Sequence, residues 1–248
     1  MARKEDDHRA PVPPRELTLG ATLRLAPPSP LLPARWHGRP VIVLFACHTG
    51  DPATAGADLA PLRRLGLPIA DAVGQTRYAD QQSLLDATQP KGNCNVWRSE
   101  FLPRPLSDGA LRALADHGDG MAAPLSQLVV LHLGGALAER DEAATAFGNR
   151  DAGWFYAAAA CWPPDRPDLA VDRAWVDRAW AAIRPHSTGG NYVNVQGADD
   201  GDVRLRAAYR GGALERLARV KAAYDPNNLF RVNRNIAPAA VAAAAPGA

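Results

Sequence analysis

A stretch near the end of the 248-residue chain has the pattern of an amphipathic helix with a sharp stop. Apolar residues recur there at helical spacing, with charged residues between them: Leu214, Leu217, Val220 and Tyr224. We predict that the helix ends at Tyr224, because the proline in Asp225-Pro226 disfavours helical backbone in the residue before it. Leu229-Phe230 then supplies an apolar anchor. The chain is therefore expected to close on a helix followed by a hydrophobic segment.

Composition indicates an ordinary globular protein. The chain is 47% hydrophobic and 22% charged, and it is long enough to bury a sizeable core. A formal net charge of +2 argues against a nucleic-acid binder that works through bulk electrostatics. The cysteines, Cys47, Cys94 and Cys161, are far apart and form no C-x-x-C pair, so neither a disulfide framework nor a metal site is indicated.

The sequence shows no pattern of a targeting signal or a membrane span. The start, MARKEDDHRA, is charged and has no apolar run behind it. Elsewhere, no apolar stretch approaches membrane-spanning length. We expect a soluble cytoplasmic protein that binds neither membrane nor nucleic acid.

The order of the periodic segments indicates an α+β fold. Alternating or continuous apolar runs predict strands at Leu17–Leu25, Pro40–Cys47, Leu125–Leu133, Trp154–Trp162 and Asn191–Gln196. Helical patterns predict helices at Asp58–Leu65, Ala79–Thr88, Ser107–His117 and Val171–Ile183. The run from Pro40 is continuously apolar, which predicts a buried strand. Since strands and helices are interspersed without regular alternation, we expect a mainly antiparallel sheet with helices packed on one face.

Several motifs together resemble one enzyme family. The string from Lys221 to Phe230 reads K-x-x-Y-D-P-x-N-x-F; the pattern N-x-N-I-x-P closes it, and Tyr192-Val193-Asn194 precedes it. This arrangement resembles the C-terminal segment of the berberine-bridge-enzyme-like FAD-linked oxidases. Three upstream stretches are similar to further parts of that family and occur in the same order: PVIVLFACHTGD, GNCNVWRSEF and TAFGNR. The resemblance runs from about Glu16 to Pro238.

The resemblance implies a division of the chain. Residues 15–190 are similar to the family's substrate-binding domain and residues 191–238 to its C-terminal berberine-bridge-type segment, while the tails 1–14 and 239–248 are expected to be disordered. Family members also carry an N-terminal FAD-binding domain, in which a glycine-rich loop holds the pyrophosphate. No strand–glycine-loop–helix pattern of that kind occurs in this sequence. We therefore expect that this chain does not bind FAD by itself.

The strongest site candidates lie at Tyr192, Asn194 and Gln196. In a strand they share one face, and Val193 and Val195 take the other. A phenol can transfer a proton, and an amide can hydrogen-bond the edge of a flavin ring. The resemblance implies a catalytic role for Tyr192 and a cofactor-binding role for Asn194, with Gln196 toward the substrate; the alternative is a solvated outer face with no ligand. Many family members have a second aromatic residue where this chain has Val195, which leaves the identity of the base open.

Two further residues, Trp97 and His132, are candidates for substrate binding. Trp97 lies in a W-R-S string similar to the family's W-K-S, with Arg98 in place of lysine. Core packing is the alternative for Trp97, and a solvated surface charge is expected for Arg98. Val96 stands where many members have a tyrosine. His132 is predicted to share a strand face with aliphatic residues, so a satisfied core histidine is the alternative there.

The resemblance implies the C-terminal portion of a bacterial-type FAD-dependent oxidoreductase. Its reaction would transfer a hydride from a substrate C–H bond to the flavin, a base would take a hydroxyl proton, and dioxygen would reoxidise the flavin. The implied substrates are hydroxylated small molecules such as sugars, alcohols or secondary metabolites. Two alternatives remain open: a non-catalytic remnant that folds without flavin, and one subunit of a split enzyme that needs a separate FAD-binding chain.

Overall fold

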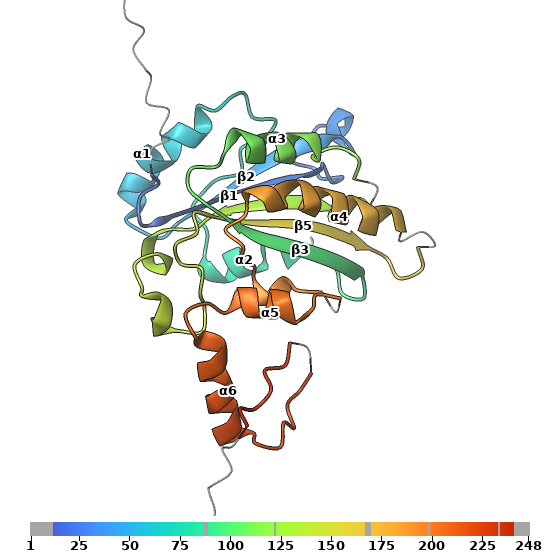
Figure 1. Ribbon diagram of the computed structural model, residues 1–248. Helices are drawn as coiled ribbons and strands as arrows, with labels where there is room; N and C mark the ends of the chain where they lie inside the picture. The colour runs from blue at the N-terminus through green and yellow to red at the C-terminus, as the bar shows by residue number, and fades with distance from the viewer. Residues whose placement is uncertain are drawn as a thin grey trace, which may run out of the picture.

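A five-stranded antiparallel sheet with helices on one face forms the body of the molecule (Figure 1). The predicted α+β class with a mainly antiparallel sheet is confirmed, and α3 (Asp108–Asp116) and α4 (Ala170–Ile183) pack together on one face of that sheet. The structure is a computed structural model and describes residues 12–86, 89–121, 123–166, 170–197, 199–232 and 234–240.

The sheet has the order β2-β1-β4-β5-β3, and every neighbouring pair is antiparallel. Its strands are β1 (Leu17–Leu25), β2 (Pro40–His48), β3 (Cys94–Leu102), β4 (Gln127–His132) and β5 (Trp154–Trp162). β5 lies between two partners, and its alanine run, residues 157–160, is almost fully buried. The sheet is therefore most deeply buried at β5.

Helices connect the strands and continue beyond the sheet. The α-helices of the described residues are α1 (Pro52–Arg63), α2 (Tyr78–Ser83), α3 (Asp108–Asp116), α4 (Ala170–Ile183), α5 (Asp202–Ala208) and α6 (Ala213–Tyr224). Short 3-10 helices are η1 (Ala34–Trp36), η3 (Gly135–Leu137), η4 (Glu142–Ala144), η5 (Arg184–His186) and η6 (Val193–Val195).

The main core lies between the sheet and helices α3 and α4. Trp175, Val176 and Ile183 of α4 are almost fully buried, and they share one apolar cluster with Leu102 of β3 and Leu128 of β4. Complete burial of one such side chain stabilises the fold by about 1.5–3 kcal/mol. This cluster therefore fixes α4 over the β3–β5–β4 part of the sheet.

Most predicted elements are present near their predicted positions. The strands predicted at 17–25 and 154–162 match β1 and β5 at both ends, and the helix predicted at 171–183 matches α4 to within one residue. The helix predicted at 107–117 is α3, and Ser107 is its N-cap, since its Oγ accepts a hydrogen bond from the backbone N–H of Ala110 at 3.1 Å.

Two predicted helices have different bounds in the structure. α1 begins at Pro52 rather than Asp58, because the side chain of Asp51 caps it by accepting a hydrogen bond from the backbone N–H of Ala53 at 2.9 Å. α2 ends at Ser83, and residues 87–88 of the predicted helix lie outside the described part of the chain. β3 and α5 were not predicted as elements.

The prediction that the Pro40–Cys47 run is a buried strand is wrong. The run forms β2, but β2 is an edge strand that pairs only with β1 among the described strands. Ile42, Val43 and Leu44 are 67%, 41% and 45% exposed. The apolar sequence made this segment a strand, but no described element covers Ile42, Val43 and Leu44.

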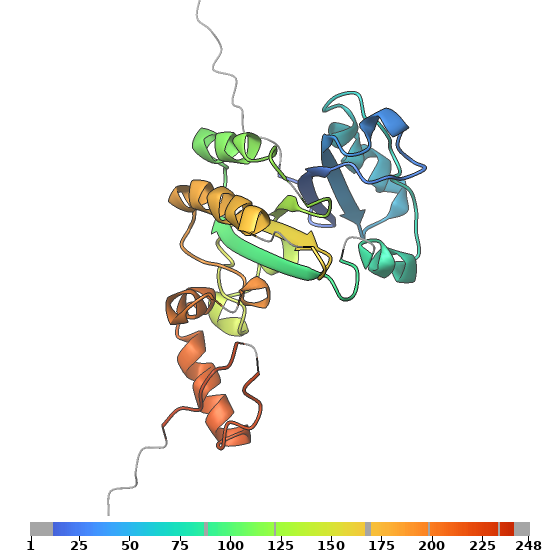
Figure 2. The same cartoon turned by 90° about the vertical axis from the view of Figure 1, so that its right-hand side faces the viewer.

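The C-terminal helix ends where the sequence predicts, at Tyr224. The side chain of Asp225 then accepts hydrogen bonds from the backbone N–H groups of Leu229 at 2.7 Å and Phe230 at 3.0 Å, and it pairs with Lys221. In both views α6 and the segment after it extend away from the sheet (Figure 1, Figure 2). Tyr224, Leu229 and Phe230 are left exposed.

Candidate functional site

The segment with the strongest site candidates is not a strand, contrary to the prediction for Asn191–Gln196. Val193–Val195 forms the 3-10 helix η6. A 3-10 helix returns to the same side after three residues, so Tyr192 and Val195 pack into one apolar cluster. The expected division, with Tyr192, Asn194 and Gln196 on one face and the valines on the other, is therefore wrong.

This second cluster lies on the sheet face that α3 and α4 do not cover. Phe101 belongs to it, whereas the next residue on β3, Leu102, belongs to the helix-side core, as alternation along a strand requires. The ring of Tyr192 meets Phe155 at 6.0 Å and Phe147 at 6.3 Å between centroids, both edge to face. The sheet thus presents an aromatic surface with one phenol at its margin.

Two hydrogen bonds hold Tyr192, one at its backbone and one at its phenol. The backbone N–H of Tyr192 donates to Ser99 Oγ at 3.2 Å, which attaches the residue to β3. Asn194 Nδ2 donates to Tyr192 Oη at 2.7 Å, and the Asn194 side chain is exposed. Because the oxygen accepts this bond, the phenolic O–H remains available to donate to another group.

The side chain of Gln196 turns inward. Its Nε2 donates to Asn191 Oδ1 at 2.5 Å and to the backbone oxygen of Arg204 at 2.9 Å. Gln196 Oε1 is buried and has no hydrogen-bond partner among the described residues. A buried acceptor of this kind normally has a donor, and a ligand hydroxyl can supply one.

Three of the five predicted site residues line one cavity of about 530 Å³. Trp97, Asn194 and Gln196 meet there, and the other lining residues are Asn95, Val96, Arg173, Val195, Gly197 and Asp199. Tyr192 is not among the lining residues but is joined to the cavity through Asn194. The structure therefore brings four of the five candidates to one place.

Arg98 is buried, contrary to the expectation of a solvated charge. Its Nη2 and Nη1 donate to the two carboxylate oxygens of Asp199 at 2.5 and 3.1 Å, and its Nε lies 3.3 Å from Asp177 Oδ1. Burial alone would lower the pKa of Arg98, but the hydrogen bond and charge of Asp199 raise it overall. The same hydrogen bond lowers the pKa of Asp199. Asp199, the acidic member of this ion pair, lines the cavity.

A buried carboxylate anchors the whole site segment to the sheet, and sequence analysis missed it. Glu100 of β3 accepts hydrogen bonds from Trp180 Nε1 at 2.8 Å, Ser187 Oγ at 2.5 Å and Arg204 Nη1 at 2.8 Å. Arg204 also lies with its guanidinium carbon 5.0 Å from the Trp180 ring centroid. Since Ser187 and Arg204 flank the segment that carries Tyr192, Glu100 fixes both of its ends.

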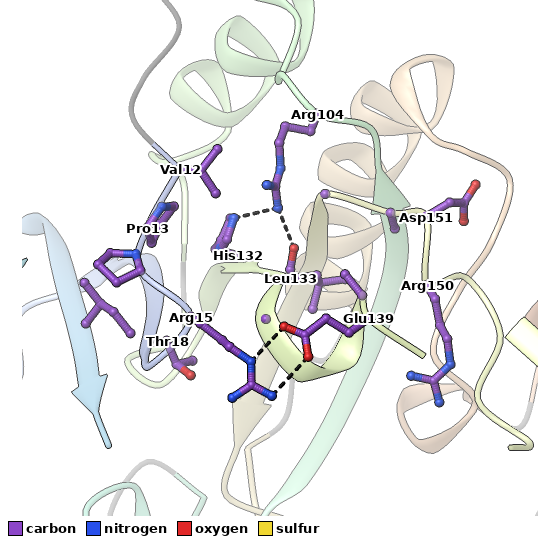
Figure 3. Close-up of a pocket in the computed structure, with 17 residues that line it drawn as sticks. Val12, Pro13, Arg15, Thr18, Arg104, His132, Leu133, Glu139, Arg150 and Asp151 are labelled. Carbon is purple, nitrogen blue, oxygen red and sulfur yellow. Dashed lines mark hydrogen bonds and ion pairs between the residues drawn. The ribbon is translucent and has the colours of Figure 1, made fainter. Parts of the chain in front are cut away.

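His132 lies in a different cavity, of about 500 Å³, at the end of β4 (Figure 3). Arg104 Nη2 donates to His132 Nε2 at 2.6 Å and to the backbone oxygen of Leu133 at 2.5 Å. Burial, and then the positive charge of Arg104, lower the pKa of His132. Arg15 and Glu139 form an ion pair in the same cavity (Figure 3). The structure does not bring His132 to the Tyr192 site, so a substrate-binding role there has no geometric support.

The two valines singled out by the sequence occupy different environments. Val96 is buried in the helix-side core, although it also borders the cavity, so a phenol at that position would not join the aromatic face. Val195 packs on that face beside Tyr192. Among the described residues, Tyr192 is thus the phenol of this face.

The described residues fit only part of an FAD molecule. Asn194 and Tyr192 present polar groups beside an aromatic surface, which suits the edge of a flavin ring. None of the described strand-to-helix connections forms a glycine-rich cradle for a pyrophosphate. No group of three or more His, Cys, Asp or Glu in the described residues is placed to hold a metal ion, and no described helix is long and apolar enough to cross a membrane.

Comparison with known proteins links these features to one family. Residues 191–237 match the family model described as "Berberine and berberine like". An FAD-linked oxidoreductase of Dictyostelium discoideum is 23% identical over 198 residues, 79% of this chain and 42% of that protein. The FAD-linked oxidoreductase YgaK of Bacillus subtilis, described as uncharacterized, is 30% identical over 189 residues, 73% of this chain and 39% of that protein. Residues 191–237 therefore form a berberine-bridge-type segment, and most of the chain is homologous to part of FAD-linked oxidoreductases.

Solved structures show the same fold. The 6-hydroxy-D-nicotine oxidase of Arthrobacter nicotinovorans superposes with a TM-score of 0.71 at 21% identity, covering 89% of this chain and 48% of that one. A chitooligosaccharide oxidase gives a TM-score of 0.64 at 19% identity, covering 90% and 48%. The sheet and its helices match the substrate-binding domain of FAD-linked oxidases. The chain spans about 40% of the length of these curated relatives and about half of these solved chains.

Proposed function

We propose that this chain forms the substrate side of an FAD-dependent oxidoreductase that acts on a hydroxylated small molecule. The flavin-binding half is supplied by a polypeptide region with the pyrophosphate cradle that the described residues lack. One observation carries the proposal: the Tyr192–Asn194 hydrogen bond stands at the margin of an aromatic sheet face that α3 and α4 leave uncovered, next to the cavity of about 530 Å³.

In this proposal FAD, when bound, supplies the acceptor for a hydride from the substrate. The protein residues then handle the proton and the position of the substrate. Asn194 fixes the Tyr192 oxygen and leaves its O–H free to bond a substrate hydroxyl. Loss of the phenolic proton would leave an oxygen that accepts the substrate's proton, with the Asn194 amide stabilising its charge. Gln196 Oε1 offers a second contact for a hydroxyl group.

The mixed lining of the cavity supports a small hydroxylated substrate. Trp97 offers an apolar ring, and Asn194, Gln196 and Asn95 offer amides. Two structural relatives have names that denote oxidation of an oligosaccharide and of a hydroxylated alkaloid. Sugars, alcohols and hydroxylated secondary metabolites are thus the classes to test.

The test replaces the phenol in a flavin-loaded protein. The full chain is fused behind the flavin-binding portion of YgaK, and flavin reduction by a panel of sugars and alcohols is followed by anaerobic stopped-flow absorbance. We expect Tyr192→Phe to lower the reduction rate by about a hundred-fold to ten-thousand-fold, the usual contribution of general acid–base catalysis. Tyr156→Phe is the matched control, because Tyr156 is buried in the helix-side core.

The expected stability effects separate catalysis from folding. Losing the Tyr192 hydroxyl should cost only about 1 kcal/mol of unfolding free energy, measured by thermal melts. Reduction of Tyr192→Phe at the unsubstituted rate would exclude the phenol as the base.

A non-catalytic binding protein is the second candidate, and Val195 favours it. Val195 packs beside Tyr192 where many family members have a further aromatic residue, so this face carries Tyr192 as its phenol among the described residues. A flavin-loaded fusion that binds compounds of the panel without reduction of its flavin would support this second function.

A further inference from the structure

The sheet contains one complete structural unit and one partial unit of the same topology. The complete unit runs β3, α3, β4, β5, and is followed by α4. Within it, β4 and β5 are antiparallel neighbours, and β3 pairs antiparallel with the outer edge of β5. α3 and α4 both lie on the same face of these strands (Figure 1).

The β1–β2 hairpin repeats the second half of that unit. β1 and β2 are antiparallel and are followed by α1, as β4 and β5 are followed by α4. β1 and β4 are antiparallel neighbours at the middle of the sheet, so the two hairpins are related by an approximate two-fold axis. α1 lies on the same face as α4 (Figure 1), and His48 Nε2 of β2 bonds Asp58 Oδ2 of α1 at 2.9 Å.

The described residues contain no counterpart of β3 and α3 for this hairpin. The outer edge of β2 pairs with no described strand. On its helix side, Ile42 and Leu44 are 67% and 45% exposed, whereas Leu128, on the same side of β4, is fully buried. α1 buries none of its residues, whereas α4 buries five.

The free edge of β2 is suited to strand pairing. From Val41 to Cys47 it carries no charged residue and no proline, and it forms an unbroken nine-residue pairing with β1 on its other side. Natural edge strands are normally protected from pairing by charges, prolines or bulges. This edge has none of these along its described central part.

We propose that the β2 edge and the adjoining helix-side surface bind a strand–helix segment of the polypeptide that carries the flavin-binding half. Its strand pairs antiparallel with β2, as β3 pairs with β5, and its amphipathic helix covers Ile42 and Leu44, as α3 covers the other half. The inference rests on the two-part enzyme proposed above. It adds where the second part attaches and what structure attaches there.

A second copy of this chain would not satisfy the same surface. Pairing of β2 with the β2 of a copy would extend the sheet, but it would bring two uncovered halves side by side and no helix to cover Ile42 or Leu44. The curated relatives contain more than half of their length outside the region that this chain matches, which is ample for one strand and one helix.

The test compares two fusions with the full chain alone. Both carry the flavin-binding portion of YgaK in front of this chain; one includes the roughly 40 residues that directly precede its matched region, enough for a strand, a helix and their turns, and the other omits them. Amide hydrogen exchange of β2 is the readout. In the longer fusion we expect the outward amides of β2 to exchange at least about tenfold more slowly than in the chain alone, and in the shorter fusion at the rate of the chain alone.

A substitution on the surface supplies the matched control. Leu44→Lys should abolish the added protection in the longer fusion, whereas Val203→Lys, at an 81% exposed position on α5, should leave it intact. Equal β2 protection in both fusions, no protection in either, or β2 protection in the chain alone through self-association would each overturn the inference. Visible absorbance reports the proposed function separately: protected β2 in a longer fusion that holds no flavin supports this attachment site and contradicts the FAD proposal.

Discussion

The two halves of the sheet share a topology but differ in cover. In the β4–β5–β3 half, α3 and α4 lie on one face of the strands. Large side chains of these strands, such as Leu102 and Leu128, are fully buried against the two helices. In the β1–β2 half, no residue of α1 is itself buried, and Ile42, Val43 and Leu44 of β2 are exposed to solvent. The comparison teaches that an apolar strand is buried only when a layer exists to cover it. The β4–β5–β3 half has a closed core, and the β1–β2 half has the exposed surface that we propose binds a strand and a helix.

The largest expected difference comes from the same substitution in each half. Leu128→Ala in β4 should lower the unfolding free energy by about 3 kcal/mol, because it leaves a cavity in a closed core. Leu44→Ala in β2 should cost under about 1 kcal/mol, because much of that side chain is already in water. Urea unfolding of both variants measures the contrast, and equal losses would show that β2 is covered in solution.

A smaller loss of unfolding free energy is expected for Glu100, which attaches the segment that carries Tyr192 to the covered half of the sheet. Glu100→Gln should cost about 2 kcal/mol, because Arg204 loses the charge of one of its two buried carboxylate partners, Glu100, and keeps that of Asp200. The loss should be local, with faster amide exchange at residues 187–197 than in α4. Asp151→Asn is the control, since the Arg210–Asp151 pair is exposed at its carboxylate and should contribute little. Uniformly faster exchange in both regions would contradict an anchoring role.

The smallest effect concerns pH and the end of β4. Burial, and then the charge of Arg104, lower the pKa of His132 below its ordinary value of 6.5, so the unfolded chain binds this proton more readily than the folded one. The corresponding stability is fully present above about pH 6.5 and is lost as pH falls toward the folded-state pKa. Unfolding free energies at pH 7.5 and 5.5 should therefore differ less in His132→Gln than in the unsubstituted chain. An unchanged difference would assign the pH dependence to other groups.

The local sequence pattern was sufficient to predict the elements whose apolar residues pack directly against a described layer. The strand at Trp154–Trp162 was predictable from its continuous apolar run, and the helix at Val171–Ile183 from apolar residues at helical spacing. Both elements pack against a described layer, so their burial followed. β2 has an equally apolar run, so its sequence predicted a strand correctly and burial wrongly. Burial depends on the covering element, which a local pattern does not encode.

The candidate site was predictable as a set of residues but not as a geometry. The polar–apolar alternation from Asn191 to Gln196 is typical of a strand, yet hydrogen bonds to Ser99 and to the Arg204 backbone hold the segment in another shape. The Glu100–Arg204 contact joins residues 104 positions apart. Single-sequence periodicity cannot reveal such a contact, because it carries information only about neighbours within an element.

The most direct test of the account is whether the chain alone holds flavin. The full chain is purified in excess FAD, desalted, and compared by visible absorbance with the longer YgaK fusion under the same conditions. The account expects no stoichiometric flavin spectrum from the chain alone, because its described residues offer contacts to a ring edge and no pyrophosphate cradle, and a stoichiometric spectrum from the fusion. A stoichiometric flavin spectrum from the chain alone would contradict it.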